Sequence, residues 1–214
     1  MTAATPHHTT NGRVLHSLVR WYDLLAWVLA GGREGALRER MLDRARVTAG
    51  ERVLDVGCGT GTLAIAASRR VGAAGEVRGI DASPEMIARA RRKAAKARAG
   101  ATFELATAER LPFPDASFDV TMGTLMLHHL PRATRLECLR EMRRVLRPGG
   151  RALAVDFGLP TKRRGLIGHL HRHGHVPLDK VVEAMGEAGL NVLESGAMGT
   201  SSLYYVLAEV RRET

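Results

Sequence analysis

Three glycines at alternate positions form the part of this chain that is best suited to hold a reactive ligand. Residues 53–61 read Val-Leu-Asp-Val-Gly-Cys-Gly-Thr-Gly, an apolar run that ends in Gly57, Gly59 and Gly61. Glycine lets the backbone adopt positive φ and lets a ligand come close, because no Cβ intervenes. A helical pattern begins at Leu63, so the turn places main-chain N–H groups at a helix N-terminus. The pattern predicts a site for a polar cofactor.

The spacing of the glycines separates the cofactor classes. They follow G-x-G-x-G, and Thr62 stands where the dinucleotide fingerprint has its third glycine. No lysine follows the glycines, which excludes a P-loop. Asp81 ends the next apolar run, where a carboxylate can accept hydrogen bonds from both ribose hydroxyls. Nicotinamide enzymes and methyltransferases share that carboxylate, so Asp81 alone does not identify the cofactor.

Alternating strand and helix patterns must position these residues. Strands are predicted over 53–57, 77–81, 102–105, 118–124, 151–157, 190–195 and 203–210. Helices are predicted over 33–46, 60–71, 84–99, 132–146 and 178–188. Ser83 is the predicted N-cap of the third helix, and Pro148-Gly149-Gly150 is predicted to end the fourth. The order predicts an α/β fold, a Rossmann-like doubly wound sheet of about seven strands with helices on both faces. The sheet is mostly parallel, with one antiparallel C-terminal strand in a closing hairpin.

Length and composition favour a single domain. The chain has 214 residues, of which 45% are hydrophobic, enough for one sizeable core. We expect residues 1–12 to be a disordered tail and 13–214 to be the domain, with 13–46 as a helical cap and 157–180 as a substrate-side insertion. Cys58 and Cys138 do not make a disulfide framework, and no apolar run is long enough to cross a bilayer. These features predict a cytoplasmic protein.

The formal net charge of +10 attracts anionic partners. The basic run 89–98 is interpreted as the solvated face of a helix. Residues 123–126 lack the Asn/Asp-Pro-Pro-aromatic pattern of enzymes that methylate exocyclic amines of nucleic acids. We therefore expect a small-molecule substrate rather than nucleic acid, with an acidic membrane surface as a possible peripheral contact. The sequence predicts no oligomeric state.

Five motifs in order along the chain resemble those of the class I S-adenosylmethionine-dependent methyltransferases. The resemblance covers roughly residues 20–210 and is strongest to the branch of ubiquinone/menaquinone C-methyltransferases and related small-molecule and lipid headgroup methyltransferases. The motifs are VLDVGCGTG at 53–61, GIDAS at 79–83, AERLPFPDASFD at 108–119, LHHLP at 127–131 and RVLRPGG at 144–150.

The resemblance implies a role for each of a set of cofactor-binding residues. Asp55 and the backbone of Gly57, Cys58, Gly59 and Gly61 would hold the methionine part and the ribose side, and Asp81 the ribose hydroxyls. Ala82 and Met86 would pack near the adenine, Thr107, Ala108 and Glu109 would lie at its edge, and the carbonyls of Gly123 and Thr124 would face the methionine amino group. Relatives often carry Asp where Thr107 stands, and a threonine hydroxyl accepts a hydrogen bond less strongly than a carboxylate.

Several side chains are candidates for work on the substrate. His128 and His129 follow the fourth predicted strand, either as a base that deprotonates the acceptor or as structural residues. Tyr22 either closes over the cofactor or packs on a helix. His169, His171, His173 and His175 alternate, but no carboxylate or cysteine completes a metal site nearby, which favours a solvated or substrate-lining segment.

These observations predict transfer of a methyl group from S-adenosylmethionine, by in-line displacement, to a small-molecule acceptor. The acceptor would be quinone-like, a lipid headgroup or a secondary metabolite, and the product would be S-adenosylhomocysteine. Two alternatives stay open, an RNA or protein methyltransferase and a non-catalytic module that binds S-adenosylmethionine.

Overall fold

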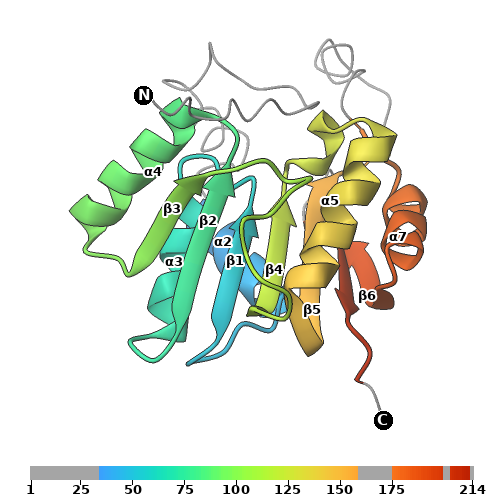
Figure 1. Ribbon diagram of the computed structural model, residues 1–214, viewed down its shortest axis with the longest axis horizontal. Coiled ribbons are helices and arrows are strands. Elements are labelled where there is room, and N and C mark those ends of the chain that lie inside the picture. Colours follow the sequence, from blue (N-terminus) through green and yellow to red (C-terminus); the bar gives the residue numbers. More distant parts are fainter. Residues whose placement is uncertain (1–33, 159–174, 200–202, 213–214) are drawn as a thin grey trace, which may run out of the picture.

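The computed structural model describes residues 34–158, 175–199 and 203–212, which form a seven-stranded sheet with helices on both sides (Figure 1). The strand order is β3-β2-β1-β4-β5-β7-β6, and β7 alone runs against its neighbours. The strands are β1 (Arg52–Val56), β2 (Glu76–Asp81), β3 (Ala101–Leu105), β4 (Phe118–Thr124), β5 (Leu146–Phe157), β6 (Asn191–Ala197) and β7 (Leu203–Glu209). The predicted fold class is confirmed.

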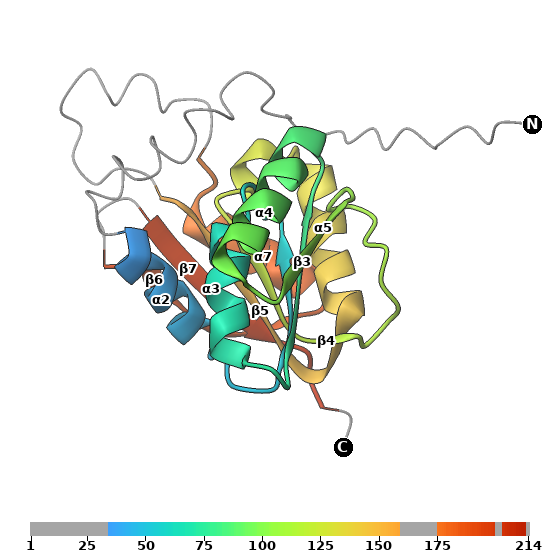
Figure 2. The same ribbon diagram turned by 90° about the vertical axis from the view of Figure 1, so that its left-hand side faces the viewer.

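Two helical layers cover the sheet. Helices α2 (Glu34–Arg44), α3 (Thr62–Val71) and α4 (Pro84–Ala97) lie on one face, and α5 (Arg132–Val145) and α7 (Leu178–Glu187) lie on the other (Figure 2). The central strands are buried on both faces, so successive side chains enter different cores. In β1, Val53 packs in the core under α3, while Leu54 packs in the core under α5.

Local sequence explains where α4 begins. The Ser83 hydroxyl accepts a hydrogen bond from the Met86 N–H at 3.2 Å, and Pro84 occupies the first helical position. A serine cap satisfies one of the otherwise unpaired N–H groups, and proline has no N–H to leave unpaired. The predicted cap is confirmed.

The predicted boundary between α5 and the next strand is wrong. The helix ends at Val145, and β5 begins at Leu146 and continues through the Pro-Gly-Gly segment that was expected to be a break. The end of β7 holds this segment in the sheet, since the Gly149 N–H donates to the Val210 carbonyl at 2.8 Å and the Val210 N–H donates to the Gly150 carbonyl at 2.9 Å. Gly149 has a φ of 77°, which glycine adopts without strain.

The strand order reverses beside β1, whose neighbours are β2 and β4. In open α/β sheets, ligands bind at such a switch point, beyond the carboxyl ends of the strands. The same edge carries the glycine turn after β1, Asp81 at the end of β2 and η1 (Leu127–His129) after β4. None of the helices in the described ranges is long and apolar enough to span a membrane.

Candidate cofactor and active site

The glycine turn has the left-handed backbone geometry that its composition predicts. Gly57, Gly59 and Gly61 have φ values of 69°, 53° and 78°, a region that other residues enter only at a cost. Space is also restricted: a Cβ on Gly61 would lie 2.6 Å from the Phe103 ring, and one on Gly57 would lie 3.0 Å from the Met126 Cβ. Both the conformation and the close packing therefore require glycine.

Asp81 links the glycine turn to the loop after β2. One carboxylate oxygen accepts the Gly59 N–H at 2.9 Å, and the other accepts the Ser83 N–H at 2.9 Å. Burial raises the pKa of this carboxyl group, and the backbone donors oppose that rise. A carboxylate offers about four lone-pair positions. The Gly59 and Ser83 N–H groups use two of these positions, and the Ala82 amide also interacts with the carboxylate, which leaves acceptor capacity for a ribose hydroxyl.

A lysine from α4 supports the turn from outside. The Lys93 ammonium donates to the hydroxyls of Thr60 and Thr62 at 3.0 and 2.9 Å. Arg91, in the same basic run, donates to the Phe103 carbonyl through two nitrogens at 3.0 and 2.8 Å. Arg91 is exposed, as predicted for a solvated helix face, whereas Lys93 is half-buried against the glycine turn.

Asp55 is a buried carboxylate without a hydrogen-bond partner. The residue is 1% exposed, and neither carboxylate oxygen has a hydrogen bond of normal geometry within the described residues. Burial raises the pKa of Asp55 to about 7, the Ala64 amide in the first turn of α3 partly offsets that rise, and the Asp81 carboxylate adds to it. An orphaned buried carboxylate at the foot of the glycine turn fits a cationic group of a bound cofactor.

Cys58 lies beside the same two carboxylates and is not suited to act as a nucleophile. Burial, and then the negative charges of Asp55 and Asp81, raise the pKa of its thiol well above the usual value. The reactive species of a cysteine is the thiolate, so the raised pKa keeps this side chain unreactive. A packing role is consistent with the small space between the thiol and Gly79.

The residues expected near the adenine gather at the ends of β2 and β3. Met86, Thr107 and Ala108 are buried. The Ala106 N–H donates to the Asp81 carbonyl at 3.1 Å, which fixes the loop after β3 against the loop after β2. Ala82 and Glu109 are half-buried in these two loops. The structure thus brings the predicted set to one edge, while their contacts with a cofactor stay a prediction.

His128 pairs with a carboxylate on the neighbouring strand. Its Nδ1 lies 2.6 Å from an Asp156 carboxylate oxygen, and its backbone N–H donates to the other oxygen at 3.0 Å. The Asp156 side chain is fully buried, and 10% of the His128 side chain is exposed. The His129 ring lies against the His128 ring with 3.9 Å between the centroids. This is the aspartate–histidine arrangement that holds an imidazole in one tautomer.

Sequence reasoning missed Asp156 and Arg135. Arg135, in the first turn of α5, donates to the carbonyls of Leu127 and Leu130 at 3.1 and 3.0 Å, and so fixes both ends of the short turn that carries His128. Asp156 ends an apolar run, as Asp81 does, and that signal was available in the sequence. Arg135 carries no such signal.

The loop between β4 and η1 is strained. Leu125 has a φ of 56° and donates its N–H to the Val155 carbonyl at 2.7 Å. A non-glycine residue in this region costs free energy, and such residues concentrate at functional sites. Gly123 and Thr124 end β4 directly before it, at the position expected to face the methionine amino group.

Some predicted residues lie outside the described ranges. Tyr22, His169, His171 and His173 belong to this group, and so does most of the predicted substrate-side insertion. His175 is described, and its ring lies 6.5 Å from that of Phe157, centroid to centroid.

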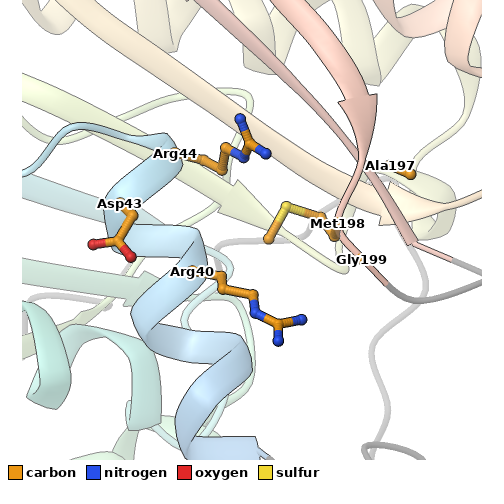
Figure 3. A pocket seen from close by; sticks show the side chains of 6 residues that line it. All are labelled: Arg40, Asp43, Arg44, Ala197, Met198 and Gly199. Atoms are coloured by element: carbon orange, nitrogen blue, oxygen red, sulfur yellow. The ribbon is translucent and has the colours of Figure 1, made fainter.

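A separate cavity of about 580 Å³ lies between α2 and the turn after β6 (Figure 3). None of the predicted site residues lines it. One of its arginines already interacts with other side chains. The Arg44 guanidinium lies over the Tyr205 ring, 4.4 Å from the centroid, and within 3.8 Å of the Glu194 carboxylate. The lining residues are Arg40, Asp43, Arg44, Ala197, Met198 and Gly199.

Comparison with known proteins decides the family. Residues 53–150 match the family model described as a methyltransferase domain. The chain is 39% identical over 160 residues to the ubiquinone/menaquinone biosynthesis C-methyltransferase of Azotobacter vinelandii, which covers 74% of this chain and 62% of that protein. The chain belongs to the class I S-adenosylmethionine-dependent methyltransferases.

A second curated relative is similar to the same extent, and a solved structure shares the fold at lower identity. The 27-O-demethylrifamycin SV methyltransferase of Amycolatopsis mediterranei is 39% identical over 166 residues, covering 72% of this chain and 59% of that protein. A crystal structure of a methyltransferase from Aquifex aeolicus superposes with a TM-score of 0.77 at 23% identity, covering 92% of this chain and all of that one. The chain thus spans about three fifths of the length of these two curated relatives, and the solved structure supports the fold.

Proposed function

We propose that this protein transfers a methyl group from S-adenosylmethionine to a small-molecule acceptor. The observation that carries the proposal is the pairing of two features across the β1–β4 switch point. On one side lies the glycine turn with Asp81, and on the other lies the His128–Asp156 pair. The first suits a nucleoside cofactor and the second suits proton removal.

The cofactor would be held by groups at the ends of four strands, β1 to β4. Asp81 would accept hydrogen bonds from the ribose hydroxyls, because its bonds to Gly59 and Ser83 fix it in place and leave acceptor capacity. Asp55 would neutralise a positive charge of the methionine part. The first turn of α4 with Met86, and the loops that contain Ala82, Thr107, Ala108 and Glu109, would surround the adenine. Gly123 and Thr124 would face the amino group.

When bound, S-adenosylmethionine supplies a sulfonium-activated methyl group. The protein must align the acceptor with that group and exclude water, and such positioning supplies about 7–11 kcal/mol of the barrier reduction. A base is required when the acceptor arrives protonated.

His128 is the best-placed base in the part of the chain that the structure describes. A carboxylate accepts hydrogen bonds, so the hydrogen on the His128 imidazole lies on Nδ1, directed at Asp156. The lone pair of Nε2 is then left to take a proton from a hydroxyl, an ammonium or an acidic carbon. The His129 ring lies beside this ring at a tilt of 46° and is assigned a supporting role.

The relatives favour a small acceptor but not one acceptor atom. One is named for C-methylation in quinone biosynthesis, and another, at the same identity, for a demethylrifamycin. We propose an acceptor of this size and chemistry, a quinone-like ring, a lipid headgroup or a secondary metabolite.

The test is transfer of a labelled methyl group. The protein is incubated with methyl-labelled S-adenosylmethionine and a bacterial extract, which is then separated into small metabolites, lipids, RNA and protein. We expect label in the metabolite or lipid fraction, and its loss in Asp81→Ala. Label confined to RNA or protein would overturn the small-molecule assignment. Cofactor binding without transfer to any fraction would identify a binding module instead.

A further inference from the structure

We infer that Asp55 holds a proton while the cofactor site is empty and releases it to solvent when the positively charged end of the cofactor binds. The inference rests on the proposed function, because it concerns the same cofactor. A carboxylate with only a structural role would not release a proton when the ligand binds.

The first observation is geometric. Asp55 is 1% exposed, and both of its carboxylate oxygens lack a hydrogen-bond partner within the described residues. Asp81, the other carboxylate of the site, has each oxygen paired with a backbone N–H. The Ala64 amide offsets only part of the cost of ionising a carboxylate buried this deeply, so such a group either takes a proton or awaits a cation.

Within the described residues, the groups that face Asp55 come from four segments, and none of them is a cation. The Asp81 carboxylate on β2 repels a second negative charge. Burial, and then the charges of Asp55 and Asp81, raise the pKa of the Cys58 thiol in the glycine turn, so this group adds no charge. The Ala64 amide at the start of α3 is a dipole, and its effect is smaller than that of burial. On the next strand, Met122 pairs with Asp55 in the β1–β4 register and adds no charge.

The chemistry of the cofactor supplies the missing charge. Its methionine part carries an α-ammonium, which the product S-adenosylhomocysteine retains. On binding, the O–H bond of the Asp55 carboxylic acid breaks, the proton passes to solvent, and the carboxylate faces the ammonium. Above pH 7 Asp55 is already ionised and little is released, whereas below pH 7 the release approaches one proton.

The experiment is calorimetry of S-adenosylhomocysteine binding at pH 6.0 in two buffers with different ionisation enthalpies. An α-ammonium titrates near pH 7.7–8.0 and stays charged at pH 6.0, so it does not mask the signal. We expect the wild type to release about 0.9 proton per bound ligand, and its affinity to rise about 15-fold from pH 5.5 to 7.0.

Three controls isolate the source of the proton. Asp55→Asn mimics the protonated group, so it should bind without proton release and with an affinity that varies less than about 2-fold over this pH range. Asp81→Ala should bind more weakly but still release the proton. Adenosine, which lacks the methionine part, should bind wild type without releasing one.

The outcomes separate this inference from the proposed function. Binding of S-adenosylhomocysteine with no proton release, or with equal release in Asp55→Asn, would overturn the inference and leave the proposed function standing. Failure of both S-adenosylmethionine and S-adenosylhomocysteine to bind at any pH would overturn both.

Discussion

Three aspartates lie at or next to the carboxyl ends of strands at the same edge of the sheet, and their surroundings give them different chemistry. Among the described residues, Asp55 accepts no hydrogen bond of normal geometry, Asp81 accepts the N–H groups of Gly59 and Ser83, and Asp156 accepts from an imidazole and from the backbone N–H groups of His128 and Phe157. Identical side chains acquire different roles when burial and donors differ. We assign the first to charge neutralisation, the second to ribose binding and the third to orientation of a base.

The Asp81 assignment predicts a specific loss of cofactor affinity. Asp81→Ala removes the acceptor for the ribose hydroxyls and should weaken S-adenosylhomocysteine binding by about 1.5–3 kcal/mol, the range for hydrogen bonds to a charged group. Isothermal titration calorimetry measures the change. Asp115→Ala is the matched control, because that carboxylate pairs with Arg144 away from the site. Equal affinity in the wild type and Asp81→Ala would remove Asp81 from the site.

The His128 assignment predicts that catalysis and cofactor binding respond separately. His128→Gln should lower the rate of methyl transfer about 10²- to 10⁴-fold, the usual contribution of a general base, while S-adenosylhomocysteine affinity stays within a factor of about two. Asp156→Asn should lower the rate as well, because the imidazole loses the acceptor that orients it. His129→Gln is the comparison, since the carboxylate pairs with His128. A larger loss in His129→Gln than in His128→Gln would reverse the assignment.

At the scale of elements, the periodic patterns predicted the sheet because its central strands are apolar on both faces. The glycine turn, the strand-end position of Asp81 and the Ser83 cap were also predictable, since each depends on residues close in sequence. The end of α5 was not, because Pro148-Gly149-Gly150 stays in β5 through hydrogen bonds with Val210, far along the chain.

The His128–Asp156 pair shows again that local sequence patterns do not reveal contacts between distant residues. His128 was identified from its place after β4, but the choice between a base and a structural residue depended on a partner 28 positions away. Arg135 could not be identified from the sequence for the same reason, because it acts by donating hydrogen bonds to two backbone carbonyls of the preceding turn. Lys93 looked like one member of a charge run until its contacts with Thr60 and Thr62 were known.

Two glycines with positive φ, one of them in the glycine turn, are predicted to differ in the cost of an alanine substitution. Gly50 and Gly61 have similar φ values of 81° and 78°, but a Cβ on Gly50 meets nothing within 4 Å, whereas one on Gly61 would lie 2.6 Å from Phe103. Gly50→Ala should therefore cost only the conformational strain, about 1–2 kcal/mol. Gly61→Ala should cost that strain plus about 1–3 kcal/mol of overpacking. Denaturant unfolding measures both, and equal destabilisation would show that the Phe103 contact is not tight.

At the scale of the whole molecule, the Asp55 carboxyl group links stability to pH. Its pKa in the fold is about 7, above the unfolded value near 4, so the folded protein holds this proton more tightly. Folding is therefore unaffected by this group below about pH 4, and it loses stability as the pH rises from about 4 to 7. The molecule tolerates a buried charge where a cofactor can neutralise it.

This linkage predicts a stabilising substitution. Asp55→Asn should raise the free energy of unfolding of the cofactor-free protein at pH 8 by an amount on the order of 2–4 kcal/mol, and by less at pH 5, where the wild-type group is already protonated. Thermal unfolding at the two pH values measures the difference. A gain of the same size at both pH values would contradict the raised pKa.

The central claim is that the glycine turn and Asp81 form a site for S-adenosylmethionine. Calorimetric titration of the wild-type protein with S-adenosylmethionine, and separately with NAD, tests it most directly. The account predicts one molecule of S-adenosylmethionine per chain, bound more weakly by Asp81→Ala, and no binding of NAD. Binding of NAD without binding of S-adenosylmethionine would contradict it.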